Sequence, residues 1–153
     1  MVIDFHAHVF NGVQGQNVKG KTVSGSFGEI ICGNHAEKFL PGYFEKTAFP
    51  VKMLVELMDQ AGIGRALLLQ NPTIGLVNDT LLEAVRSYPD RFRGSIQVDP
   101  ADPNGVETLC HYAAFQNMCA LKLEMSHEWG WSGIHPGLLL ESPQIFSLGC
   151  SLS

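Results

Sequence analysis

The sequence predicts an α/β protein with a parallel sheet. Short apolar runs bounded by turn residues alternate with stretches whose apolar residues recur at helical spacing, which is typical of repeated βα units. The 153 residues are 45% hydrophobic and 16% charged, so the chain is long and apolar enough for one domain with a buried core.

The chain opens with an apolar run over residues 2–8, which predicts a buried strand. Residues 11–50 are rich in glycine and show neither helical nor strand periodicity. We expect a long irregular loop there. Loops of that length inside a compact domain are usually either functional or disordered, and a functional one directly after residues 2–8 would form a wall of a site.

Three helices are expected after this segment. Residues 51–61 place apolar side chains on one helical face, and Gly62 follows as the left-handed residue that ends a helix. Residues 79–88 form the second helix, with Thr80 and Glu83 as a capping box. The third opens with Asp102 as the N-cap and a proline in the first turn.

Three further apolar runs predict strands over residues 65–70, 93–98 and 119–125. In the last run, leucines alternate with Lys122 and Glu124, so the two charged side chains share one face. We expect the leucines to face helices and the charges to point to the interior. The alternative is an edge strand with Lys122 and Glu124 in water. Ser95 and Gln97 share a face of the third strand in the same way.

Two histidines in the first strand carry the chemistry. His6 and His8 are two residues apart, and side chains at that spacing on a strand point to the same face. Two imidazoles so placed can bind one metal ion. The alternative is a pair of histidines satisfied by hydrogen bonds at a strand end. Asp4 is expected on the same face, either orienting a histidine or pairing with Lys122.

The net charge and the hydropathy of the chain limit the kinds of molecule that it is expected to bind. The net charge of −5 argues against nucleic acid and against an anionic membrane surface. The sequence has no apolar run long enough to cross a membrane and no recognisable secretory signal, so a cytoplasmic protein is expected. The spacings of the cysteines match neither a CxxC nor a zinc-ribbon pattern, and reduced thiols are expected.

Several stretches match a known family. The opening VIDFHAHVF, followed by AGIGRALLLQNP, SYPDRFRGSIQVDP and CALKLEMSHEWGW, resembles the amidohydrolase superfamily, in particular the amidohydrolase-related (amidohydrolase 2) group. The likeness covers roughly residues 2–143. That group contains metal-dependent hydrolases and non-oxidative decarboxylases of aromatic acids.

The resemblance implies a (β/α)8 TIM barrel with a divalent metal, zinc or alternatively manganese, at the carboxyl ends of the strands. It carries His6 and His8 over as metal ligands. Glu124, Lys122 and His127 are candidates for an additional ligand or a substrate contact, and no catalytic acid or base is assigned. Further family ligands come from later strands.

The length is the main departure from the family, because such a barrel needs about 250 residues. The expectation is therefore a partial barrel, about the first four βα units, with residues 1–153 as the N-terminal half of a barrel domain. Residues 142–153 show no amphipathic turn, and we interpret them as a candidate non-native tail.

The resemblance predicts a hydrolase acting on a carbon–nitrogen, ester or lactone bond of a small molecule. The alternatives are a decarboxylase of the same family and a catalytically inactive fragment. A third alternative is a metal-binding module completed by a partner's ligands. Exposed barrel edges would favour a homo-oligomer.

Overall fold

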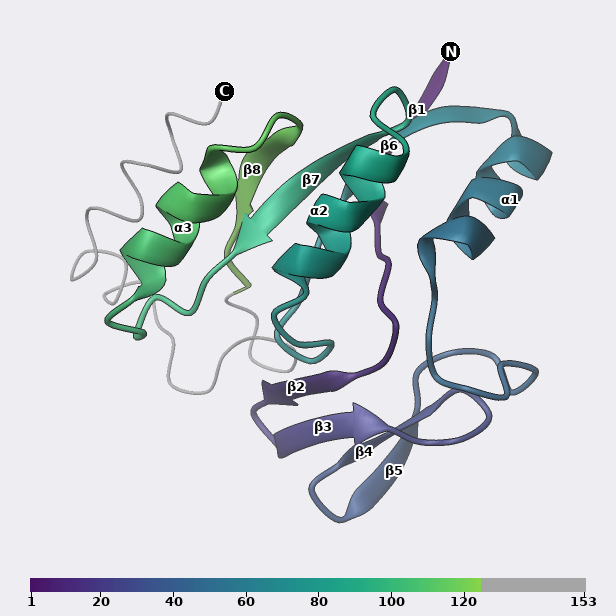
Figure 1. Ribbon diagram of the computed structural model, residues 1–153. Coiled ribbons are helices and arrows are strands. Elements are labelled where there is room, and N and C mark those ends of the chain that lie inside the picture. Colours follow the sequence, from purple (N-terminus) through teal and green to yellow (C-terminus); the bar gives the residue numbers. More distant parts are fainter. Residues whose placement is uncertain (125–153) are drawn as a thin grey trace.

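The computed structural model describes residues 1–124, which form two four-stranded sheets and three helices (Figure 1). The elements, in chain order, are β1 (Val2–Ala7), β2 (Gln14–Asn17), β3 (Gly20–Ser24), β4 (Glu29–Cys32), β5 (His35–Lys38), α1 (Val51–Ala61), β6 (Ile63–Leu68), α2 (Asn78–Ser87), β7 (Phe92–Gln97), α3 (Gly105–Ala113) and β8 (Met118–Lys122).

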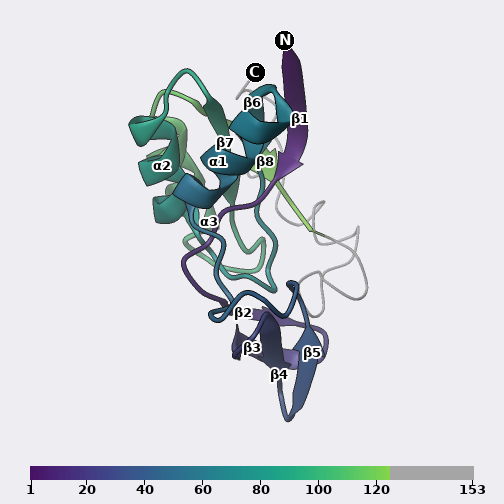
Figure 2. The same cartoon turned by 90° about the vertical axis from the view of Figure 1, so that its right-hand side faces the viewer.

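One sheet is parallel and has the order β1-β6-β7-β8, so strands that follow one another as βα units are neighbours in space. The three helices lie on one side of it (Figure 2). Between the sheet and the helices lies the main core, in which Phe92, Ile96, Leu68 and Leu109 are fully buried. No described helix is long and apolar enough to cross a membrane.

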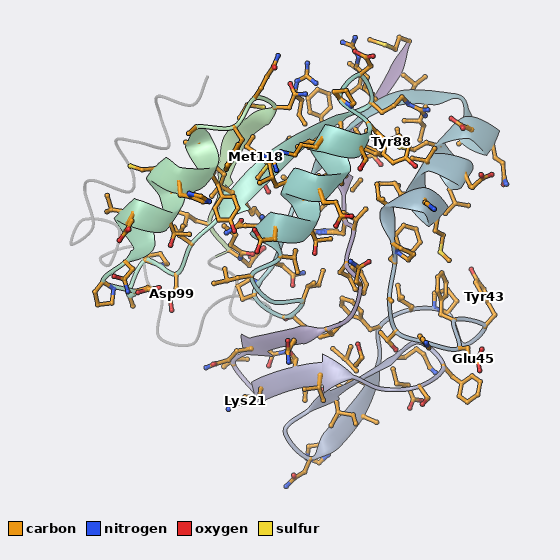
Figure 3. All side chains as sticks on the ribbon, in the orientation of Figure 1. Lys21, Tyr43, Glu45, Tyr88, Asp99 and Met118 are labelled. Carbon is orange, nitrogen blue, oxygen red and sulfur yellow. The ribbon has the colours of Figure 1, made fainter. Side chains whose placement is uncertain are left out.

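The second sheet is antiparallel, has the order β2-β3-β4-β5, and lies below the carboxyl ends of the parallel strands in Figure 1. The prediction of an irregular loop over residues 11–50 is therefore wrong. A smaller core of Phe10, Val13, Ile30, Cys32 and Ile74 joins this sheet to the parallel part. Figure 3 shows Tyr43 and Glu45 in the segment after β5, away from the parallel sheet.

The prediction of a partial (β/α)8 barrel is also wrong. The described chain has one open parallel sheet of four strands, a separate antiparallel sheet and three helices. The first connection does not run directly from strand to helix, because residues 14–38 pair with one another into β2–β5 before α1 begins. The α/β alternation that was predicted holds for β6, β7 and β8.

Helix α1 matches its predicted bounds, with Leu54 and Met58 buried. It ends at Gly62, which has the left-handed φ of 69° that a non-glycine residue adopts only at a cost. The caps predicted for the other two helices are wrong. Helix α2 begins at Asn78, before Thr80, and α3 begins at Gly105, while Asp102 accepts a hydrogen bond from the Asn104 backbone in the preceding turn.

Strand β1 is an edge strand among the described residues, since it pairs with β6 alone. Its apolar side chains are unusually open: Val2 and Phe5 are 57% and 70% exposed. Such an edge is a template for pairing with another chain. Association of two chains through the β1 edge stays a prediction. The non-native tail expected over residues 142–153 lies outside the described residues.

Candidate functional site

The candidate site lies where the parallel strands end. His8 follows β1, Leu69 and Gln70 follow β6, Gln97 closes β7, and Glu124 follows β8. Because the strands are parallel, these positions share one edge of the sheet. That edge is where open α/β sheets bind their ligands.

The His6 and His8 rings converge. Their Nε2 atoms are 3.1 Å apart and the ring centroids 5.0 Å apart. Two nitrogens that each lie about 2.0–2.1 Å from one zinc ion are about 3.3 Å apart at the tetrahedral angle. The observed separation therefore fits two ligands of a single metal ion. It equally allows a hydrogen bond between the rings, which is the alternative reading of the pair.

The tautomer of His8 is set by the strand beside it. Its Nδ1 lies 3.0 Å from the carbonyl oxygen of Leu69, which can only accept a hydrogen bond. The proton is therefore on Nδ1, and Nε2 presents a lone pair toward His6. Proteins usually orient a metal-binding histidine in this way, with a backbone carbonyl that accepts a hydrogen bond from the ring nitrogen that does not bind the metal.

Burial keeps His8 neutral. Desolvation lowers the pKa of the His8 imidazole below its ordinary value of 6.5, and the neighbouring His6 and Lys122 lower it further. A neutral ring is the form that binds metal, because the lone pair is free. His6 is exposed, so the pair has one ring anchored in the protein and one facing outward.

Asp4 forms a hydrogen bond with the backbone, whereas the sequence predicted that it orients a histidine ring or pairs with Lys122. Its Oδ1 accepts a hydrogen bond of 2.8 Å from the His6 backbone N–H. The bond sits at a register shift, because Asp4 pairs with Ala66 and Ala7 with Leu68, so β1 advances three residues while β6 advances two. Such bulges re-aim side chains beside active sites. Asp4 therefore stabilises the irregular stretch of β1 that carries His6 and leads to His8.

Lys122 and Glu124 pair with each other. Lys122 Nζ lies 2.8 Å from Glu124 Oε2, and the two side chains are 23% and 19% exposed. The sequence predicted either two charges in the interior or two charges in water. The observed pair is partly buried, which is intermediate between these two predictions. Glu124 and His8 line one cavity. Of the other candidates, His127 lies outside the described residues.

The cavity beside His8 has a volume of ≈ 500 Å³. Its polar lining is His8, Asn71 and Glu124, and the rest is apolar: Phe10, Phe39, Leu40, Phe49 and Ile74. Residues 11–50 thus supply part of the wall of this cavity. A second hollow of ≈ 520 Å³ between β2, β3 and residues 72–76 has no acidic, histidine or cysteine side chain in its described lining. The cavity beside His8 is therefore the better candidate for a metal-dependent site, because it contains a histidine and a carboxylate.

The two histidines lack a third partner within residues 1–124. No group of three histidine, cysteine, aspartate or glutamate side chains gathers there closely enough to hold a metal. Zinc sites normally use three or four protein ligands. The pair therefore fits part of a metal site, and its remaining ligands are not among the described residues as they are arranged here.

Comparison with known proteins supports the fold. One solved structure that resembles the chain is a probable 2-pyrone-4,6-dicarboxylic acid hydrolase from Acinetobacter baumannii, with citric acid bound. The TM-score is 0.52 at 20% sequence identity, over 96% of this chain and 46% of that one. The chain thus spans about half the length of that hydrolase. No protein-family model matches it. No curated protein matches it.

Proposed function

We propose that His6 and His8 bind a divalent metal ion in a hydrolase site that acts on a small molecule with an ester, lactone or carbon–nitrogen bond. The observation that carries the proposal is the convergence of the two Nε2 atoms at 3.1 Å, with His8 Nδ1 held by the Leu69 carbonyl. Zinc suits nitrogen ligands, and manganese is the alternative.

The fold neighbour supports the class of reaction. Its name describes hydrolysis of a pyrone, which is a cyclic ester. A divalent metal in such a site polarises a substrate oxygen or lowers the pKa of bound water. The cavity next to His8 is of a size suited to a small-molecule substrate, with apolar walls and a few polar groups at one end.

The chain's own residues have separate roles in this proposal. The Leu69 carbonyl holds the His8 ring in the tautomer that binds metal. Lys122 places a positive charge near His8, and its ion pair with Glu124 offsets that charge. Glu124 is the described carboxylate in the cavity, so it is the candidate proton acceptor; as a third ligand it would have to leave Lys122 and move toward the histidine pair, and His127 is a further candidate.

Metal content tests the proposal directly. The purified 153-residue protein is loaded with zinc, desalted, and analysed by elemental mass spectrometry. We expect about one zinc per chain, and loss of it in both His6→Ala and His8→Ala. Cobalt loading gives a second readout, because its visible absorption reports the ligand set.

His35→Ala is the matched control. His35 is an exposed histidine on the β4–β5 hairpin, in the other sheet. Its variant should keep the metal. Unchanged zinc content in His6→Ala and His8→Ala, with the fold intact by circular dichroism, would overturn the proposal. A metal-loaded protein is then assayed for hydrolysis of lactones and cyclic amides.

A further inference from the structure

A further cavity lies on the face of the parallel sheet that the helices do not cover. It has a volume of ≈ 330 Å³ and is lined by residues of all four parallel strands. Ala66 and Phe92 pack in the core beneath the helices. Because side chains alternate along a strand, Arg65, Leu67 and Arg93 project from the opposite face. The cavity is therefore a hollow on the open face, near the amino ends of the strands.

One side of this cavity is apolar and open to solvent. Phe5 and Ile3 of β1 are 70% and 42% exposed, and both line it. Ile3 pairs in register with Arg65, and Leu67 with Arg93, so an apolar side chain lies beside an arginine at two levels of the sheet. Covering the apolar side chains removes their surface from water, which favours a ligand with an apolar body.

Arg65 and Arg93 bring two positive charges to the same cavity. Both are held by the turn before β7: Arg65 Nε donates to the Asp90 carbonyl at 3.2 Å, and Arg93 Nη1 to the Pro89 carbonyl at 2.9 Å. Within residues 1–124, neither forms an ion pair, and the two Nη atoms of Arg65 and Nη2 of Arg93 have no hydrogen-bond partner. Each guanidinium is thus anchored at one nitrogen and has donors left for a ligand.

No acidic side chain neutralises these two charges inside the cavity. The third arginine of the lining, Arg91, is already paired with Asp59 at 2.8 Å. None of the described lining residues is acidic, although the chain as a whole has a net charge of −5. Guanidinium groups bind carboxylates through paired N–H donors. The cavity therefore complements a molecule that is apolar at one end and anionic at the other.

We propose that this cavity binds a small carboxylate with an apolar body. The apolar part covers Phe5 and Ile3, and the carboxylate accepts hydrogen bonds from Arg65 and Arg93. The volume of ≈ 330 Å³ lies within the range of known small-molecule sites. This site is distinct from the metal site and does not rest on the proposed function, because His8 follows the other end of β1.

Calorimetric titration of the metal-free 153-residue protein with 4-phenylbutyrate tests the proposal. We expect saturable binding with a dissociation constant of about 1 mM or below. The alcohol 4-phenylbutan-1-ol has the same apolar body without the charge, and it should bind about tenfold more weakly. Absence of carboxylate binding, or equal binding of the acid and the alcohol, overturns the proposal. His8→Ala should bind 4-phenylbutyrate as the wild type does, and loss of binding in that variant would also overturn it.

Substitutions locate the site. Arg65→Gln and Arg93→Gln should each weaken 4-phenylbutyrate binding about three- to tenfold. Lys52→Gln is the matched control, because it removes the same charge from an exposed position of α1, and it should change nothing. Equal affinities of the three variants, each folded by circular dichroism, would contradict the proposal.

Phe5→Ala provides a test that does not touch the turn before β7. Phe5 is 70% exposed, so its removal should leave the fold intact and weaken binding. Tyr43→Ala, at an aromatic residue that is 82% exposed and outside the cavity lining, is its control. Unchanged affinity in Phe5→Ala would overturn the proposal even if the arginine variants did not fold.

A second copy of the chain is the competing occupant, because association through the β1 edge would cover Ile3 and Phe5. Sedimentation velocity over a range of protein concentrations measures that association beside the titrations. The proposal requires 4-phenylbutyrate to bind equally well at every concentration. Binding that disappears as the chains associate would assign the face to a second copy and overturn the proposal.

Discussion

Substituting Gly15 with alanine should weaken the packing of the antiparallel sheet against the parallel part of the molecule. Gly15 lies in the middle of β2, where the chain passes against residues 72–75. A Cβ built there would lie 2.1 Å from the Pro72 carbonyl oxygen and 2.5 Å from that of Thr73. Both are backbone atoms in a buried segment, so they cannot move aside as a flexible side chain would.

The cost follows from the contacts that must open. The approach is held by two backbone hydrogen bonds, from Gln14 N–H to Ile74 at 2.9 Å and from Gln16 N–H to Pro72 at 2.8 Å. Relieving the overlap lengthens or breaks both of them and loosens the small core around Ile74. Overpacking and lost hydrogen bonds together predict a loss of about 2–4 kcal/mol in the free energy of unfolding.

Urea unfolding measures this loss, and Gly12→Ala is the matched control. A Cβ at Gly12 would meet only Ser24 Oγ, at 3.5 Å, which is an ordinary contact. That variant should be neutral or more stable by up to about 1 kcal/mol, because alanine restricts the unfolded chain. Equal stabilities of the two variants would refute the reasoning. Gly15→Ala should also deform the His8 cavity, whose wall includes Ile74.

Two further predictions concern titration. Because burial lowers the His8 pKa below 6.5, His8 stabilises the fold fully above that pH and less as pH falls through the folded-state pKa; His8→Gln should therefore flatten the stability profile below about pH 6.5. An unchanged slope would exclude His8 as its source. Burial and the hydrogen bond to Asp79 raise the pKa of Tyr112 to about 12. Stability should fall as pH rises from about 10 toward that value. Tyr112→Phe should remove this dependence and cost about 0.5–1.5 kcal/mol at neutral pH, because it deletes the 2.7 Å bond between α3 and α2. A variant as stable as the wild type would show that the bond contributes nothing.

The elements that the sequence predicted well are those with a strong local signal. Helix α1 has a regular apolar face and a glycine directly after it, and both features act over a few residues. Strands β6, β7 and β8 are apolar runs between breakers, and their predicted bounds differ from the observed ones by a few residues at most.

The antiparallel sheet was missed because its strands are short, polar and half-exposed. One signal was available: Gly33-Asn34 between Glu29–Cys32 and His35–Lys38 is a two-residue hairpin turn, and Gly33 has the positive φ of 59° that such turns require. Reading it would have replaced the irregular loop by a hairpin, and with it the simple succession of βα units that the barrel prediction assumed.

The N-termini of α2 and α3 show a different limit of prediction from sequence. The Thr80 capping box and the Asp102 cap are valid local patterns, but α2 begins earlier, where the buried Gln70 side chain accepts the Val77 N–H. A side chain from the segment that follows β6 thus satisfies the helix end. No pattern within the helix itself could reveal this.

By itself, the sequence predicted the alternation of strands and helices over β6, β7 and β8, and of polar with apolar side chains on β7 and β8. It also singled out His6 and His8, whose role as metal ligands stays a prediction. These follow from periodicities of two and 3.6 residues, which are properties of the local chain. Only the tertiary structure decided that the two Nε2 atoms converge, that the Leu69 carbonyl sets the His8 tautomer, and that Gln70 and Asn78 fix the backbone under Ser95 and Gln97. Those relations join residues up to 61 positions apart, and they arise from how the strands register against one another.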